Sequence, residues 1–325
     1  MKGEKMKFDI ILGNPPYQES DGGAGVSATP VYNKFIEETK KLDPEVMDLI
    51  IPAKWYSGGK GLDQFREAML NDPKISVLVD YTSSLDVFPG VDVAGGVCYF
   101  IRDAKHNGEC KFTNYHNGQK TSALRKLNDF STFIRYPLAA NIVKKVASLK
   151  ENTLNNYVSS RKPFGLATTA RPLPSGDIIL RYNGGTGPYK SSEIKTGKEI
   201  IDKWKIIISR LTAEHAGQPN KDGKFKVLST MEMLKPQEIC SETYLVAGSF
   251  ETELEAQNYM DYLKTRFVRF LLLQIAITQQ ISKATFSFVP VQDFSQKWTD
   301  QKLYQKYNLT TDEIAFIENM VKEME

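Results

Sequence analysis

The sequence has few cysteines, no long apolar run and no large excess of charge of either sign. Its three cysteines among 325 residues are too few and too scattered for a disulfide framework, which is typical of a reducing compartment. Arg269 and Gln274 interrupt the most apolar window, so the sequence predicts a cytoplasmic protein with no membrane span. The 42 basic and 39 acidic residues leave a net charge of +3, too small to identify a partner by overall charge.

The pattern along the first 140 residues predicts an α/β domain. Short apolar segments alternate with segments of helical periodicity, as in βαβ units on a largely parallel sheet. The expected strands are 8–13, 46–51 and 75–81, and the expected helices are 31–41 and 62–70. Two further apolar segments, 93–101 and 110–117, are predicted to form a hairpin at one edge. Three strands with two helices make only half of a doubly wound sheet.

The residue pattern changes near residue 141, which predicts a second domain over residues 141–325. Short strands and Gly/Pro-rich turns indicate an irregular α+β fold. Residues 151–240 contain 14 basic and 9 acidic residues, so the modest positive excess is local to this domain. Residues 251–281 are predicted to form a long helical stretch and residues 311–320 a short amphipathic helix.

The motif that carries chemistry is Asn14-Pro15-Pro16-Tyr17, directly after the first strand. Ligands of open α/β sheets bind beyond the carboxyl ends of strands. Two prolines donate no N–H, so the loop presents carbonyls, and Asn14 adds a side-chain carbonyl. Two such acceptors can take both hydrogens of a planar –NH₂ group and free its lone pair for attack. Tyr17 would stack on a flat substrate. The alternative is a rigid turn that closes the strand.

The motif, with segments 49–55 and 86–89, resembles the N6-adenine DNA methyltransferases of the gamma type. The similarity is closest to the Eco57I- and TaqI-like restriction–modification enzymes and extends over nearly the whole chain. It implies that residues 1–140 are the C-terminal half of a Rossmann-like methyltransferase domain and residues 141–325 a target-recognition domain. It also implies S-adenosylmethionine as cofactor, double-stranded DNA as partner, and a target adenine flipped out of the duplex.

The resemblance implies a role for each residue of the motif. Asn14 and the carbonyl of Pro15 would accept the two N6 hydrogens, with Pro16 completing the rigid loop. Tyr17 and Phe88 would stack against the flipped adenine.

The resemblance also places Lys54, Trp55 and Lys283 near DNA. The alternative for the first two is a surface lysine and a core tryptophan. Four arginines and lysines of the second domain, interleaved with tyrosines, are further candidates for contacts with phosphates and bases, against the alternative of a solvated surface. They are Arg161, Lys162, Arg171 and Arg181.

The sequence departs from the family in one respect. The family binds S-adenosylmethionine through a Gly-rich strand–loop and an acidic residue, both of which precede the Asn-Pro-Pro-Tyr motif. Only thirteen residues precede Asn14, and the Gly-containing segments 183–187 and 246–249 lack the aromatic residue and the paired-glycine spacing. Segment 22–25 follows a loop instead of a strand and fails as well. We therefore expect the chain to be the C-terminal part of a longer or split enzyme, inactive without an N-terminal cofactor-binding half.

Other functions share parts of this pattern. Methyltransferases that act on a release-factor glutamine or on ribosomal-RNA guanine also use the motif, but only a short remnant of the sheet follows it there. A non-catalytic DNA-recognition module with a vestigial loop is a further alternative. Asp177 with Glu193 and Lys195 weakly resembles a nuclease signature, and the spacing of His106, Cys110 and His116 is too loose for a zinc ribbon, so no metal site is predicted.

Overall fold

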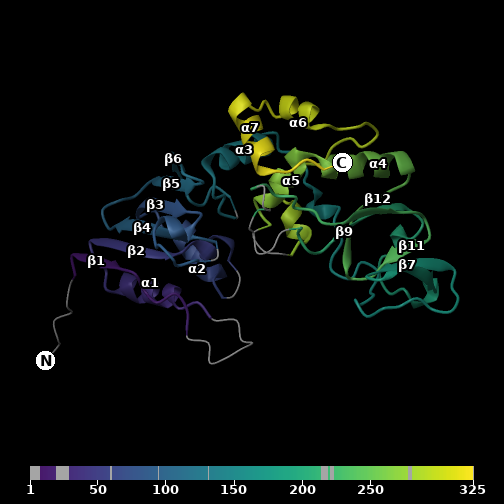
Figure 1. The fold of residues 1–325 in the computed structure, drawn as a ribbon, viewed down its shortest axis with the longest axis horizontal. Coiled ribbons are helices and arrows are strands. Elements are labelled where there is room, and N and C mark those ends of the chain that lie inside the picture. Colours follow the sequence, from purple (N-terminus) through teal and green to yellow (C-terminus); the bar gives the residue numbers. More distant parts are fainter. Residues whose placement is uncertain are drawn as a thin grey trace. The chain divides into compact units, whose positions relative to one another are not determined.

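The computed structural model describes residues 8–19, 29–58, 61–93, 95–130, 132–213, 219, 223–276 and 280–324. The chain divides into two compact units, Met1–Ala140 and Asn141–Glu325, each described here by itself (Figure 1). Within the described residues, no helix has the length and apolarity needed to cross a membrane. Cys98, Cys110 and Cys240 are buried and unpaired.

The first unit is built on a six-stranded mixed sheet in the order β1-β2-β4-β3-β5-β6. The strands are β1 (Ile10–Gly13), β2 (Val46–Pro52), β3 (Ile75–Tyr81), β4 (Val97–Asp103), β5 (Cys110–His116) and β6 (Gln119–Arg125). Strands β1, β2, β3 and β5 run in one direction, while β4 and β6 are antiparallel to their neighbours. Helix α1 (Tyr32–Lys41) connects β1 to β2, and α2 (Asp63–Leu70) lies between β2 and β3. The predicted α/β class is confirmed.

The predicted hairpin at the sheet edge is wrong. Strand β4 does not pair with β5 but lies between β2 and β3 and is antiparallel to both. Its apolar segment Val97–Ile101 belongs in the interior of the sheet, where each flank is covered by a neighbour. The edge hairpin is formed instead by β5 and β6, and β6 was not predicted because its polar, alternately exposed residues give only a weak strand signal.

One face of this sheet is covered by both α-helices. Paired residues of neighbouring strands point to the same face, and one such row runs through Leu49, Phe100, Leu78 and Phe112. These four side chains are less than 5% exposed. They share one hydrophobic core with four helix residues, Tyr32 and Ile36 of α1 and Phe65 and Met69 of α2. The opposite face, called the open face below, is covered by neither helix.

The second unit combines two small sheets with helices. The sheets have the orders β10-β9-β12 and β11-β7-β8. Their strands are β7 (Ile178–Tyr182), β8 (Gly185–Tyr189), β9 (Trp204–Ser209), β10 (Met231–Leu234), β11 (Glu238–Cys240) and β12 (Tyr244–Phe250). The helices are α3 (Pro137–Ser148, which crosses the boundary), α4 (Glu253–Lys264), α5 (Arg266–Leu273), α6 (Asp300–Lys306) and α7 (Thr311–Met320). The α+β character agrees with the sequence.

The long helix predicted for residues 251–281 is broken at Thr265. Its ψ of 147° is not helical, and its hydroxyl accepts a hydrogen bond from the N–H of Val268 at 3.2 Å, so Thr265 caps α5. Helix α7 has the predicted bounds and begins with a capping box formed by Thr310 and Glu313.

Lys205 on β9 is fully buried, and we expect its removal to be costly. Its amine donates hydrogen bonds to four main-chain carbonyls, at 2.6–3.2 Å: those of Ile200, Ile201, Lys203 and Lys235. Lys205→Met keeps the volume but removes this donor from all four carbonyls, of which those of Ile200, Ile201 and Lys235 keep a main-chain donor. The free energy of unfolding should therefore fall by roughly 1–3 kcal/mol. Urea unfolding measures this loss. The exposed Lys198→Met is the matched control, and an equal effect of both variants would contradict the assignment.

Candidate site at the carboxyl edge of the sheet

Three loops with predicted site residues leave the same edge of the first sheet. Because β1, β2 and β3 run in one direction, their carboxyl ends share an edge. Asn14 follows β1, Lys54 follows β2, and Phe88 lies seven residues beyond the end of β3. Strand β4 lies between β2 and β3, so the ends of β1 and β3 are separated by three strand spacings, about 14 Å. The loop that carries Phe88 would have to span this distance for Phe88 and Asn14 to contact one base.

Asn14 is exposed, and its carboxamide forms no hydrogen bond with any residue that the structure describes. The carbonyl of the half-buried Pro15 likewise has no hydrogen-bonding partner among those residues. The loop is held further along, where the carbonyl of Tyr17 accepts a hydrogen bond from the N–H of Val31 at 3.2 Å. The carbonyl oxygens of Asn14 and Pro15 are therefore available for an external –NH₂ group.

The side chain of Tyr17 holds the loop against the protein interior. Its ring is half-buried, and its hydroxyl is buried without a hydrogen-bonding partner among the described residues. Burial, with a smaller contribution from the Cys98 thiol, raises the pKa of Tyr17. The buried hydroxyls of Tyr32 and Tyr56 also lack such partners, and the pKa of each is raised by burial and by Cys98. The phenol of Tyr17 thus remains neutral at neutral pH.

Phe88 is half-buried in a loop whose shape is fixed by Ser84. The Ser84 hydroxyl donates to the carbonyl of Val91 at 2.8 Å and accepts from the N–H of Val93 at 2.7 Å. The N–H of Phe88 donates to the carbonyl of Ser84 at 2.8 Å. Sequence reasoning missed Ser84, although a serine just beyond a strand and ahead of a Pro-Gly turn is a common loop clamp.

Lys54 and Trp55 have different environments. Lys54 is exposed, whereas Trp55 is fully buried and donates a hydrogen bond from Nε1 to the Cys98 sulfur at 3.4 Å. The Trp55 ring packs against Phe65 and Phe133. The prediction that Trp55 contacts DNA is therefore wrong, because its side chain is part of the core.

A buried ion pair near the same edge was not predicted. Asp80, near the end of β3, is fully buried, and Arg135 binds both of its oxygens, at 2.6 Å from Nε and 2.7 Å from Nη2. Asn114 on β5 also donates to Asp80, and Arg135 donates to the carbonyl of Tyr81 at 3.1 Å. The neighbouring carboxylate raises the pKa of Arg135 against the effect of burial. An aspartate inside the apolar run VLVDY was the available signal.

Arg161 and Lys162 in the second unit converge on one carboxylate. Glu242 is 6% exposed, and its oxygens lie 3.2 Å from Arg161 Nε and 3.7 Å from Lys162 Nζ. The hydroxyl of Thr168 donates to the same carboxylate at 3.0 Å. Both basic side chains stay substantially exposed, at 65% for Arg161 and 46% for Lys162, so they can also face an anionic partner.

The hydrogen bond from Arg161 lowers the pKa of Glu242 to about 2. Since the unfolded value is about 4.3, this carboxylate stabilises the fold above that pH, and the contribution is lost as the pH falls toward 2. We expect Glu242→Gln to be less stable than the parent at pH 7 and the difference to shrink between pH 4.5 and pH 3. Urea unfolding at several pH values tests this. The exposed Glu199→Gln is the control, and a pH-independent difference would contradict the expectation.

The remaining basic residues that are predicted to contact DNA differ in their exposure and in their contacts within the protein. Arg181 is only 21% exposed, forms a bidentate pair with Glu232 at 2.7 Å and lies over the ring of Tyr244. The guanidinium of Arg181 is thus bound within the protein, and its contact with DNA stays a prediction. Arg171 is exposed and lies 5.3 Å from the ring of Tyr182.

Lys283 is also exposed and opens a short 3-10 helix, Lys283–Phe286.

Neither the weak nuclease signature nor a metal site gains support from the geometry. The carboxylate of Asp177 accepts hydrogen bonds from both the N–H and the hydroxyl of Ser191, which ties it to the next turn. In the described part of the chain, no group of three or more His, Cys, Asp or Glu side chains is placed to hold a metal ion.

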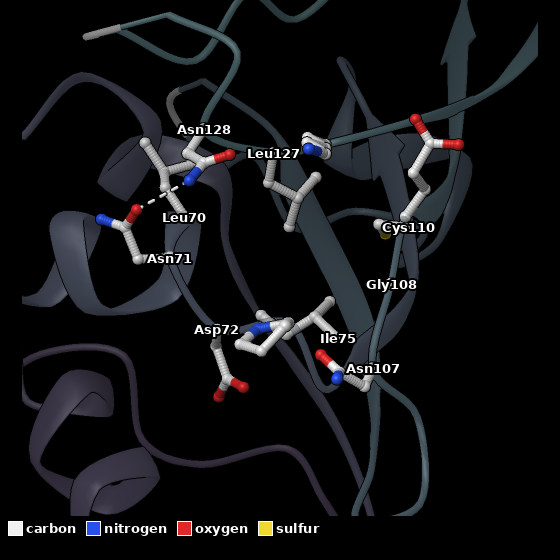
Figure 2. A pocket seen from close by; sticks show the side chains of 12 residues that line it. Leu70, Asn71, Asp72, Ile75, Asn107, Gly108, Cys110, Leu127 and Asn128 are labelled. Carbon is white, nitrogen blue, oxygen red and sulfur yellow. Dashed lines mark hydrogen bonds between the residues drawn. The ribbon is translucent and has the colours of Figure 1, made fainter.

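Figure 2 shows a cavity of about 310 Å³ at the other end of the first sheet. Ile75 and Cys110, at the starts of β3 and β5, line it, and a hydrogen bond of 2.8 Å between Asn71 and Asn128 closes one side. Since Asn14 follows the carboxyl end of β1, this cavity is not the expected pocket for a base.

The fold and the site define an α/β protein with an acceptor-rich loop at the carboxyl edge of its sheet. Residues 1–88 match the model of a family described as Eco57I restriction-modification methylase. A curated protein of Mycoplasma pneumoniae, named "uncharacterized adenine-specific methylase", is 28% identical over 173 residues, which are 49% of this chain and 41% of that protein. The resemblance is confirmed: the chain is similar to the adenine-specific methylases of restriction–modification systems.

Solved structures of restriction–modification enzymes match this chain with TM-scores below 0.5. The type IIG restriction endonuclease BpuSI matches 93% of this chain and 49% of its own, with a TM-score of 0.40 and 11% identity. The type IIL enzyme MmeI, solved in complex with DNA, matches 77% of this chain and 42% of its own, with a TM-score of 0.38 and 11% identity. This chain spans less than half the length of these proteins.

Proposed function

We propose that the chain is the base-binding and target-recognition part of a site-specific DNA adenine-N6 methyltransferase of a restriction–modification system. The observation that carries the proposal is a pair of acceptors at the carboxyl edge of β1, the Asn14 carboxamide oxygen and the Pro15 carbonyl, to which no described residue donates a hydrogen bond. The name of the Mycoplasma pneumoniae relative supports adenine as the target.

The acceptor pair would act on the electron distribution of the amino group. In adenine the N6 lone pair is delocalised into the ring, and both N6 hydrogens lie in the ring plane. Accepting both hydrogens from fixed positions favours a tetrahedral nitrogen and localises the lone pair for attack on a methyl carbon. Pro15 and Pro16 keep the acceptors in place, since their rings fix φ.

The target base has to leave the duplex before it reaches these acceptors. Tyr17 and Phe88, on loops from the ends of β1 and β3, would stack on its two faces. The exposed basic residues would contact the DNA backbone: Lys54 beside the site, and Arg161, Lys162, Arg171 and Lys283 in the second unit.

Neither of the two Gly-containing segments that the structure describes fits S-adenosylmethionine; the third, Gly22–Gly25, lies outside the described residues. Segment 183–187 forms the turn and first residues of the β7–β8 hairpin, and segment 246–249 is internal to β12. Neither is a Gly-rich loop between a strand and a helix, the element that would bind the cofactor. The methyl donor would therefore be bound by another polypeptide segment, and methyl transfer should require it.

Methylation assays with and without that segment test the proposal. The chain alone should transfer no methyl group from labelled S-adenosylmethionine to plasmid DNA, and adding the cofactor-binding half should produce N6-methyladenine in a nucleoside digest. Methylation of a release-factor peptide or of ribosomal RNA instead would support the rival methyltransferases. Sequence-specific DNA binding with no methylation would support a recognition module.

A further inference from the structure

We infer that Tyr32, the first residue of α1, is a positioning residue for the Asn14–Tyr17 loop. The inference rests on the proposed function, because it names the side chain that keeps the two acceptors of this loop in place. Tyr32 is 2% exposed, so it acts through the loop and not by contact with a base.

The loop is attached to the rest of the first unit at both of its ends. Before the loop, Gly13 is paired with Leu49 in the β1–β2 ladder. After it, the carbonyl of Tyr17 accepts a hydrogen bond from the N–H of Val31 at 3.2 Å. Between these attachments no described residue donates a hydrogen bond to either acceptor, and the two prolines fix φ. The position of the acceptors therefore depends on the two attachments.

The second attachment is a short antiparallel ribbon that leads into α1. Gln18 and Pro30 form an antiparallel bridge, and the N–H of Glu19 donates to the carbonyl of Thr29 at 3.1 Å. Val31 is the N-cap of α1, and no described side chain caps this helix. A two-stranded ribbon is at best marginally stable by itself. It therefore needs a side chain that ties it to the core.

Tyr32 supplies this tie. It follows Val31 directly, and its ring contacts Phe65 of α2 edge to face, with 5.9 Å between the ring centroids. The hydroxyls of Tyr32 and Tyr17 are both buried, and neither forms a hydrogen bond with a described residue. Burial and, to a smaller extent, the Cys98 thiol raise the pKa of both phenols. The loop and its anchor thus direct their phenols to the same part of the core.

The core around Cys98 is tightly held. Cys98 lies opposite the open face, on the side of the sheet that the helices cover, and is paired with Ile51 and Asp80. Its sulfur accepts a hydrogen bond from Trp55 Nε1 at 3.4 Å, and the ion pair with Arg135 fixes Asp80. Burial raises the pKa of the Cys98 thiol to about 12, so the thiol stays neutral. This surface provides a fixed support for the two phenols.

The alternative is that Tyr32 is only a residue of the core. In that case its loss would lower the stability of the whole first unit and would affect the loop no more than the central strands. A positioning residue acts first on the loop and on what the loop binds. The two roles therefore differ in which amides become exposed to solvent.

Hydrogen exchange of this chain, measured residue by residue by NMR, distinguishes the two roles. Tyr32→Leu keeps an apolar side chain but removes the ring contact with Phe65. The amides of Glu19 and Val31 should then exchange at least about tenfold faster than in the parent, relative to the amides of β3 and β5. Tyr32→Phe keeps the ring and should leave these amides as protected as in the parent. Phe35→Ala, which changes an exposed residue of the same helix, is the control.

A fluorescent base reports the effect on the proposed site. Under the proposed function, a single-stranded oligonucleotide that carries 2-aminopurine should lose fluorescence when this chain binds it, because Tyr17 stacks on the base. Tyr32→Leu should reduce the quenching at saturation by at least about half. The Kd of the oligonucleotide should change less than about threefold, since its phosphates are bound elsewhere. Tyr17→Ala gives the reference for lost stacking.

The two readouts separate this inference from the proposed function. Selective loosening of the loop together with reduced quenching supports the inference. Selective loosening in a chain whose parent quenches no 2-aminopurine supports the positioning role and counts against base binding. Equal acceleration in the loop and in β3 and β5, an unchanged loop, or loosening that leaves the quenching intact overturns the inference. Should Tyr32→Leu fail to fold, Phe65→Leu replaces it, because it removes the other ring of the same contact and the same outcomes apply.

Discussion

Asn14→Ala should reduce methyl transfer by the complete enzyme by about 10²–10³-fold or more, while duplex binding stays nearly unchanged. The variant removes one of two acceptors that act on the amino group as it becomes tetrahedral, so the loss should fall on kcat rather than on KM. Single-turnover methylation and a DNA-binding titration on the same preparation measure the two effects.

Two further substitutions make this result specific to the carboxamide. Asn14→Asp keeps an acceptor at the same position and should retain more activity than Asn14→Ala. Gln18→Ala changes an exposed residue just beyond the motif and should leave the rate nearly unaffected. If Asn14→Ala weakened DNA binding as much as methylation, Asn14 would be a structural residue of the loop.

The largest effect on stability is expected for Arg135→Leu. This variant leaves the fully buried Asp80 carboxylate with Asn114 as its remaining side-chain donor. Removing one partner of a buried ion pair costs about 3–5 kcal/mol, because the other charge stays buried without compensation. Urea unfolding of the purified chain at pH 7 gives the difference in free energy.

The double variant Asp80→Leu/Arg135→Leu isolates the cause. With neither charge present, much of the loss should be recovered, since an apolar pair of similar volume suits the surrounding core. Lys126→Leu, an exposed change in the same segment, should alter the stability by less than about 0.5 kcal/mol. A loss below about 1 kcal/mol for Arg135→Leu would contradict the importance of the pair.

The parts of the fold that sequence predicted are those determined by local patterns. Apolar runs bounded by turn residues predicted β2, β3 and β5 closely, and the amphipathic pattern of residues 311–320 predicted α7. The position of β4 depends on which strands it pairs with, and nothing within Val97–Asp103 encodes its neighbours. The prediction of one long helix in the second unit was wrong because the Thr265 side chain accepts a hydrogen bond that starts a new helix.

In the candidate site, too, sequence predicted the features that local patterns determine and missed those that depend on tertiary contacts. The Asn14–Tyr17 loop could be located because its residue types and its place after a strand point to one chemistry. Lys54 and Trp55 are adjacent in sequence, yet one is exposed and the other lies in the core, so the resemblance could not separate them. Arg135 and Asp80 are 55 positions apart, and only the folded chain shows that they form a pair.

The most direct measurement of the central claim is a structure of the complete enzyme bound to its DNA. The account predicts an adenine outside the duplex, with N6 at hydrogen-bonding distance, about 2.7–3.2 Å, from both the Asn14 carboxamide oxygen and the Pro15 carbonyl. An adenine bound elsewhere, or an Asn14 side chain turned away and hydrogen bonded within the protein, would contradict it.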